Sequence, residues 1–174
     1  IFIHHPDEEY VSNLQKSQLL TKIIQELEID KHNFIDDLKK LNINDQLIEN
    51  GIIIPKNSIL VKEKEIKDLL ESLSTSLSQH NKINRIYVKS NSNKEEYFLD
   101  DDTVIELIHA KLSLRRLIEA WVKLLFISSI KKNIKKTKVI FRIENHYKSQ
   151  IIQSPGVIES NLILEEYFQN SKKT

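Results

Sequence analysis

Acidic side chains gather near the middle of the chain, at a spacing that suits metal-dependent hydrolysis. Asp100, Asp101 and Asp102 stand in a row, and Glu106 follows four residues later. Two carboxylates on neighbouring strands can hold a divalent cation that activates water. We expect these acids to form a solvated turn; the alternative is an active metal-dependent hydrolase with an unusual site.

Other catalytic chemistries find little support in the sequence. The chain has no cysteine, which removes thiolate metal sites and cysteine nucleophiles. None of its six histidines forms a pair at zinc-ligand spacing. Gly51 and Gly156 are the only glycines, so neither a phosphate-binding loop nor a nucleophile elbow can be formed. We predict no metal site and no bound cofactor.

A basic segment follows the longest apolar helix and is the best local candidate for binding nucleic acid. Its five lysines are Lys131, Lys132, Lys135, Lys136 and Lys138. Such a cluster can displace counterions from DNA phosphates. The alternative is a helix end whose cations complement the helix dipole. Arg115 and Arg116 join this DNA-binding set if their face is open, and are otherwise plain surface charge.

Composition limits the classes of protein. Among 174 residues, 40% are hydrophobic and 29% charged, which is typical of a globular chain. The net charge is +1, from 26 basic and 25 acidic residues, so any contact with DNA must be local. No apolar run is long enough to span a membrane, so we expect no membrane-spanning segment in this sequence. The chain starts at Ile1 and contains no methionine, which favours a fragment of a longer protein.

Apolar spacing predicts an N-terminal helical subregion over residues 1–61. Residues 1–11 are expected to be irregular, and a helix is expected from Ser12 to about Ile29. Asp30 is a candidate N-cap for a short second helix, and a third, around Asp45–Glu49, ends at Asn50 and Gly51.

Residues 62–174 are predicted to form an α/β core with a mixed sheet, an α+β arrangement, within a single domain overall. The expected elements are a helix over Lys62–Gln79, strands over Arg85–Lys89, Glu96–Leu99 and Thr103–His109, a helix over Leu112–Ile130, strands over Thr137–Ile143 and Tyr147–Gln153, and a final helix after Gly156. The order through Ile143 is αβββαβ. Short turns make the first three strands an antiparallel meander, and the crossover helix brings the next strand back into the sheet.

The long helix carries an apolar stripe of Leu114, Leu117, Ile118, Trp121, Leu124 and Leu125. We interpret this stripe as core that faces the sheet, with a docking stripe as the alternative. We predict that a partner surface lies on the final helix, around Leu162–Phe168.

The αβββαβ order resembles the core of restriction-endonuclease-like, PD-(D/E)XK nuclease folds. The resemblance implies a site with a carboxylate on one strand and D/E-x-K on the next, where the lysine helps to position the attacking water. Asp100 or Asp101 and Glu106 would be its carboxylates, but Ile108 stands at the lysine position, so we expect a degenerate site. Ordered segments are similar to the C-terminal domain of the exodeoxyribonuclease V gamma subunit, the RecC family. These segments are Ser17–Leu27, Asn50–Pro55, Lys111–Leu125, Thr137–Arg142 and Ile163–Tyr167. One departure is the stretch Phe98–Thr103, where the family usually carries a turn that contains glycine.

The resemblance implies a cytoplasmic subunit of a bacterial helicase–nuclease that acts in double-strand break repair and homologous recombination. ATP and Mg²⁺ would be used by the partner subunits, the beta and alpha chains. The gamma subunit would handle DNA strands, and this fragment would be a nuclease-like domain without its own catalytic activity. The alternatives are an active PD-(D/E)XK nuclease and a protein-interaction domain unrelated to DNA.

Overall fold

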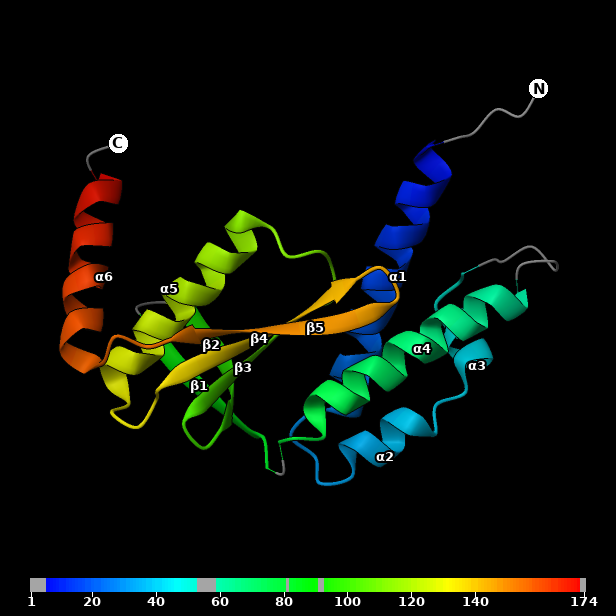
Figure 1. The fold of residues 1–174 in the computed structure, drawn as a ribbon, viewed down its shortest axis with the longest axis horizontal. Coiled ribbons are helices and arrows are strands. Elements are labelled where there is room, and N and C mark those ends of the chain that lie inside the picture. Colours follow the sequence, from blue (N-terminus) through cyan, green and yellow to red (C-terminus); the bar gives the residue numbers. More distant parts are fainter. Residues whose placement is uncertain (1–5, 53–58, 81, 91–92, 173–174) are drawn as a thin grey trace. The chain divides into compact units, whose positions relative to one another are not determined.

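A computed structural model describes residues 6–52, 59–80, 82–90 and 93–172 (Figure 1). Its internal contacts divide the chain into two compact units. A helical unit comprises Ile1–Gln79 and Arg142–Tyr147, and an α/β unit comprises His80–Phe141 and Lys148–Thr174. The division therefore falls after the fourth helix, and not after residue 61 as expected, because that helix packs with the N-terminal helices.

The helical unit contains α1 (Pro6–Leu27), α2 (Phe34–Lys39), α3 (Ile43–Glu49) and α4 (Ile59–Leu77). Its core is a set of aliphatic side chains and one phenylalanine, all of them buried: Leu19, Leu20, Ile23, Phe34, Leu38, Leu47, Ile66, Leu69, Leu70, Leu73 and Leu77. The α4 members recur at helical spacing, which is the pattern that predicted this helix. Contacts of α4 with α2 and α3 bury that face.

Two expectations for the helical unit are wrong. The segment over residues 1–11 is not irregular throughout, because α1 begins at Pro6. Proline suits the first turn of a helix, since its missing N–H would have no partner there. The N-cap of α2 is Asn33 and not Asp30. The predicted end of α3 at Asn50 is confirmed, and Gly51 follows with φ +67°.

The α/β unit contains β1 (Asn84–Ser90), β2 (Asn93–Asp100), β3 (Thr103–Ile108), α5 (Leu114–Ile130), β4 (Lys136–Ile143), β5 (His146–Gln153) and α6 (Val157–Lys172). The sheet order is β1-β2-β3-β4-β5. β1, β2 and β3 pair antiparallel, and β4 pairs parallel with β3 after the crossover through α5. The predicted mixed sheet and αβββαβ order are thus confirmed. The tip of the β4–β5 hairpin groups with the helical unit.

One face of the sheet packs against α5. The buried cluster there consists of Tyr97, Leu99, Val104, Leu124, Ile127 and Ile134, with Ile86, Val88, Phe126 and Ile152 packed around it. Side chains alternate between faces along a strand, so Tyr97 and Leu99 share one face of β2. Polar side chains on neighbouring strands can therefore meet only where the register places them on the same face.

The β2–β3 turn is tight. Asp100 pairs with Thr103, which leaves Asp101 and Asp102 as the two turn residues. Asp101 has φ +53°, a left-handed conformation that glycine adopts without strain and aspartate adopts at some cost. The turn thus keeps a geometry that favours glycine although the chain has none there.

The apolar stripe of α5 is only partly core, which corrects the expectation for its first half. Leu124 and Leu125 are buried, but Leu114 is 73% exposed and Ile118 is 45% exposed. The buried face of the helix instead runs through Ala120 and Ile127. On α6, the exposed apolar residues are Ile158, Leu162, Tyr167 and Phe168. Among the described residues, no helix is both long and apolar enough to cross a membrane.

Candidate functional site

Glu106 on β3 is held by an ion pair from the crossover helix. The Lys123 ammonium lies 3.1 Å from Oε2 of Glu106 and 3.5 Å from Oε1. Both side chains are partly buried, with exposed fractions of 32% for Lys123 and 22% for Glu106. This carboxylate therefore forms an ion pair that links strand β3 to the crossover helix.

The aromatic ring of Tyr97 completes this site. The Lys123 ammonium lies 5.1 Å from the ring centroid, within the range of a cation–π interaction. The Tyr97 hydroxyl donates a hydrogen bond of 3.0 Å to Oε2 of Glu95. Burial raises the pKa of Tyr97, and the Glu95 and Glu106 carboxylates raise it further. The phenol therefore stays protonated and acts as a donor.

Asp100 cannot join Glu106 at one metal ion. Leu99 pairs with Val104 and Asp100 pairs with Thr103, so Asp100 shares a face with Thr103. Glu106 lies three residues after Thr103, and side chains alternate along β3. Asp100 and Glu106 thus project from opposite faces of the sheet, which removes geometric support for a cation between them.

Asp100 instead belongs to a polar chain on the other face. Nδ1 of His80 lies 2.6 Å from Oδ2 of Asp100, and Nε2 of His80 lies 3.2 Å from the Lys138 ammonium. The arrangement fits an imidazole that donates to Asp100 and accepts from Lys138. Lys138 is only 7% exposed, and burial lowers its pKa. This predicted DNA contact therefore faces inward.

Ile108 lies on the same face of β3 as Glu106, at the place where a catalytic lysine would stand. Strand alternation puts residues 106 and 108 side by side on that face. No group of three or more histidine, aspartate or glutamate side chains in the described part of the chain is arranged to hold a metal ion. The Asp100, Asp101, Glu106 and Ile108 positions thus do not converge on one site.

The remaining lysines of the basic run stay near the surface. Lys132 and Lys135 are exposed, and Lys131 and Lys136 are partly exposed. Buried Ile134 anchors the segment.

This run packs against the acidic β2–β3 turn. The backbone N–H of Lys135 donates to the Asp102 carbonyl at 2.8 Å, and its ammonium lies 4.0 Å from Oδ2 of Asp102. The Asn133 amide donates to the Asp101 carbonyl at 3.3 Å. Four lysines and two aspartates leave a net charge of +2 here, so the patch remains cationic.

Arg115 and Arg116 are exposed but do not extend this patch. They lie in the first turn of α5, and Lys131 follows its last residue. With a rise of 1.5 Å per residue, the two arginines lie roughly 23 Å from Lys131 along the helix axis. Arg115 pairs with Glu119 at 3.0 Å, and Arg116 donates to the Lys111 carbonyl at 2.9 Å. The two arginines therefore form a separate cationic surface.

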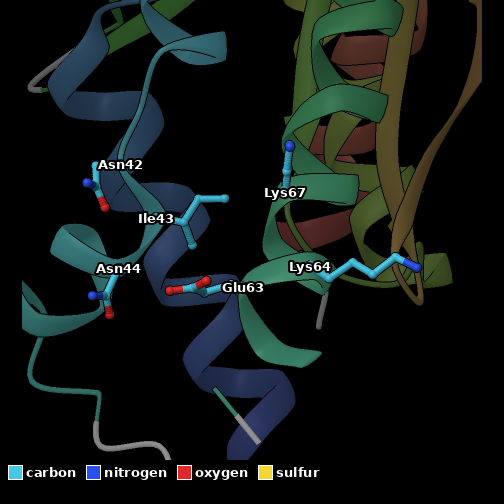
Figure 2. Close-up of a pocket in the computed structure, with 6 residues that line it drawn as sticks. All are labelled: Asn42, Ile43, Asn44, Glu63, Lys64 and Lys67. Atoms are coloured by element: carbon cyan, nitrogen blue, oxygen red, sulfur yellow. The ribbon is translucent and has the colours of Figure 1, made fainter. Parts of the chain in front are cut away.

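A polar hollow in the helical unit offers a weaker candidate. Its volume is about 390 Å³, and its lining comprises Asn42, Ile43, Asn44, Glu63, Lys64 and Lys67 (Figure 2). The Asn42 side chain accepts from the Asp45 backbone at 3.1 Å and caps α3. Figure 2 shows the Lys64 chain extending away from Glu63. Its polar groups do not converge on one point, so we assign it no ligand.

Local patterns in the sequence do not indicate the partners Lys123 and His80. Lys123 follows Glu106 by 17 positions, and His80 precedes Lys138 by 58. Only the crossover of α5 and the parallel pairing of β3 with β4 bring such residues together.

Comparison with protein families, with curated proteins and with solved structures finds no match for this chain.

Proposed function

We propose that this chain is a non-catalytic, nuclease-like domain of the RecC type, the gamma subunit of exodeoxyribonuclease V. In this proposal it serves subunit assembly with the beta and alpha chains and the handling of DNA strands. ATP and Mg²⁺ act through the partner subunits, and the work is cytoplasmic repair and recombination of broken DNA.

The observation that carries this proposal is the state of Glu106 within a nuclease-like topology. The αβββαβ order with a parallel β3–β4 pair is the one that the resemblance implies. Within it, Glu106 is bound by Lys123, and the lysine position of the motif holds Ile108. Asp100, the other candidate carboxylate, lies on the opposite face of the sheet, so it cannot share a divalent cation with Glu106. This combination supports a domain that kept the fold without the chemistry.

The lysines at the end of α5 support the DNA-handling part of the proposal. Lys131, Lys132, Lys135 and Lys136 lie within six residues and keep a net positive charge beside the acidic turn. Phosphate contacts of this kind position DNA without reading its sequence. We therefore expect affinity for DNA that falls with salt and varies little with sequence.

The test is fluorescence anisotropy with a forked DNA over a series of salt concentrations. Substituting these four lysines by glutamine should weaken binding at least about tenfold and lower the salt slope by about 0.9 for each phosphate that the variant no longer neutralises. The matched control replaces Lys39, Lys40, Lys64 and Lys67, which are exposed lysines of the helical unit. Equal weakening in both sets, or no salt-sensitive binding at all, would contradict the DNA-handling role.

A protein-interaction domain unrelated to DNA is the second candidate. It is favoured by exposed apolar side chains on α5 and α6, including Leu114, Ile118 and Ile158. In the same experiment it predicts no loss of binding when the four lysines are neutralised.

A further inference from the structure

An apolar groove lies between the first half of α5 and the strand β5. Its volume is about 440 Å³, and its walls are Leu117, Ile118 and Trp121 on one side and Gln150–Gln153 on the other. Ile118 and Ile151 are each 45% exposed. Apolar side chains exposed together along a groove are characteristic of a binding surface.

The strand that forms one wall is an edge of the sheet. β5 ends the strand order, and no strand in the described part of the chain pairs with its outer side (Figure 1). Edge strands are usually protected by charged residues, proline or bulges, because their free backbone groups accept another strand. Residues 149–153 read Ser-Gln-Ile-Ile-Gln and carry no charge. Residues 150–153 of this uncharged segment line the groove, so the groove runs along an unprotected part of the edge strand.

The charge beside the groove is weakly positive. Arg115 stands in the helical turn before Ile118, and Lys148 precedes the β5 wall. Arg116 lies roughly 160° from Ile118 around the helix and so does not border the groove. Glu119 is the single acid in the first half of α5, and it already pairs with Arg115. A second copy of the chain docked there in a symmetric manner would bring these cations together. An acidic partner would instead be attracted.

We propose that this groove binds an extended segment of another protein, in which apolar side chains alternate and acidic residues flank them. The segment adds to β5 as a further strand, and its apolar side chains contact Leu117, Ile118 and Trp121. Main-chain hydrogen bonds to an edge strand supply affinity in this mode, and pockets for alternate side chains supply specificity. The proposal goes beyond the proposed function, because it requires neither DNA nor a particular family.

The experiment selects peptides from a displayed random library on the 174-residue chain. The expected winners alternate apolar residues and carry aspartate or glutamate at their ends. Binding of a synthetic winner should weaken about tenfold or more in Ile151→Lys and in Ile118→Lys. Ile158→Lys is the matched control, since Ile158 is an exposed isoleucine of α6 that does not line the groove, and it should bind as the parent does.

Methylation of the peptide backbone nitrogens tests the strand geometry. Binding should be lost at every second position, because only alternate amides of an added strand face β5. The proposal is overturned if no peptide is enriched, or if the enriched peptides carry basic residues at their ends. It is also overturned if a selected peptide binds Ile151→Lys as tightly as the parent chain, or if the positions at which methylation abolishes binding recur every three to four residues, as in a helix. Sedimentation that reveals a dimer broken by Ile151→Lys would assign the groove to a second copy, and would overturn it as well.

Discussion

The ammonium of Lys123 lies 3.1 Å from Oε2 of Glu106 and joins the crossover helix α5 to strand β3. The pair sits beside the buried ring of Tyr97, in surroundings that exclude much of the solvent. Charges in such surroundings attract each other more strongly than on an open surface. The same carboxylate that a hydrolytic site would use therefore serves to fasten a helix to the sheet.

Replacing Lys123 with methionine should lower the free energy of unfolding by about 1 kcal/mol, because Glu106 then lies partly buried without its cation. Urea denaturation measures the change. Lys132→Met at an exposed position is the control and should change stability by less than about 0.5 kcal/mol. The double variant with Glu106→Gln should recover part of the loss; strict additivity of the two single effects would show that the residues are not coupled.

The His80 side chain should contribute more to the free energy of unfolding than the side chain of an exposed histidine. His80→Ala removes a partner of Asp100 and of the buried Lys138 ammonium, and it should cost about 1–3 kcal/mol. His146→Ala, at an exposed residue of β5, is the control. Thermal unfolding of both variants checks this expectation, and an equal melting temperature for the two would argue against a structural role for the chain of Asp100, His80 and Lys138.

The turn residue Asp101 should tolerate glycine and reject a branched side chain. Asp101→Gly should raise the free energy of unfolding by about 0.5 kcal/mol, because glycine adopts φ +53° without strain. Asp101→Val should lower it by about 1–2 kcal/mol, since a β-branched residue strongly disfavours that conformation. Chemical denaturation gives both values. A stabilising valine would mean that the turn does not hold its left-handed geometry.

Acid should weaken the helical unit through Glu65. Burial alone would raise the pKa of Glu65, but the Lys16 ammonium at 2.7 Å, assisted by Lys62, holds it below its ordinary value of 4.5. A lowered folded-state pKa means that the carboxylate contributes fully above the pKa of the unfolded chain and loses its contribution as the pH falls through the folded value.

The matching measurement compares the parent chain with Glu65→Gln by urea denaturation at about pH 7 and about pH 3. The stability lost on substitution should be about 0.5–1 kcal/mol at the higher pH and smaller at the lower. If the stability lost in Glu65→Gln were larger at the lower pH, the result would contradict a lowered pKa of Glu65 in the folded chain.

Local patterns predicted most of the elements, and long-range packing decided the rest. Strand alternation in Arg85–Lys89 and helical spacing in α4 depend on neighbouring residues, so both could be inferred from the sequence. The stripe of α5 could not be assigned in the same way, because Leu114 and Leu124 have equivalent spacing, and only the extent of the sheet decides which is covered.

The candidate site could likewise be predicted only where it depends on local sequence. The missing lysine at Ile108 was visible in the motif, but the opposite faces of Asp100 and Glu106 depend on the register of the β2–β3 hairpin. Lys138 looked like part of a basic run because composition does not distinguish an inward residue of β4 from an exposed one.

The most direct test of the central claim is a cleavage assay. The chain is incubated with linear DNA in the presence of Mg²⁺ or Mn²⁺, beside Glu106→Ala and Lys123→Met. We predict no cleavage that depends on Glu106 in either the parent chain or Lys123→Met, because Asp100 stays on the other face and Ile108 replaces the lysine. Robust metal-dependent cleavage by the parent chain that Glu106→Ala abolishes would contradict a non-catalytic domain.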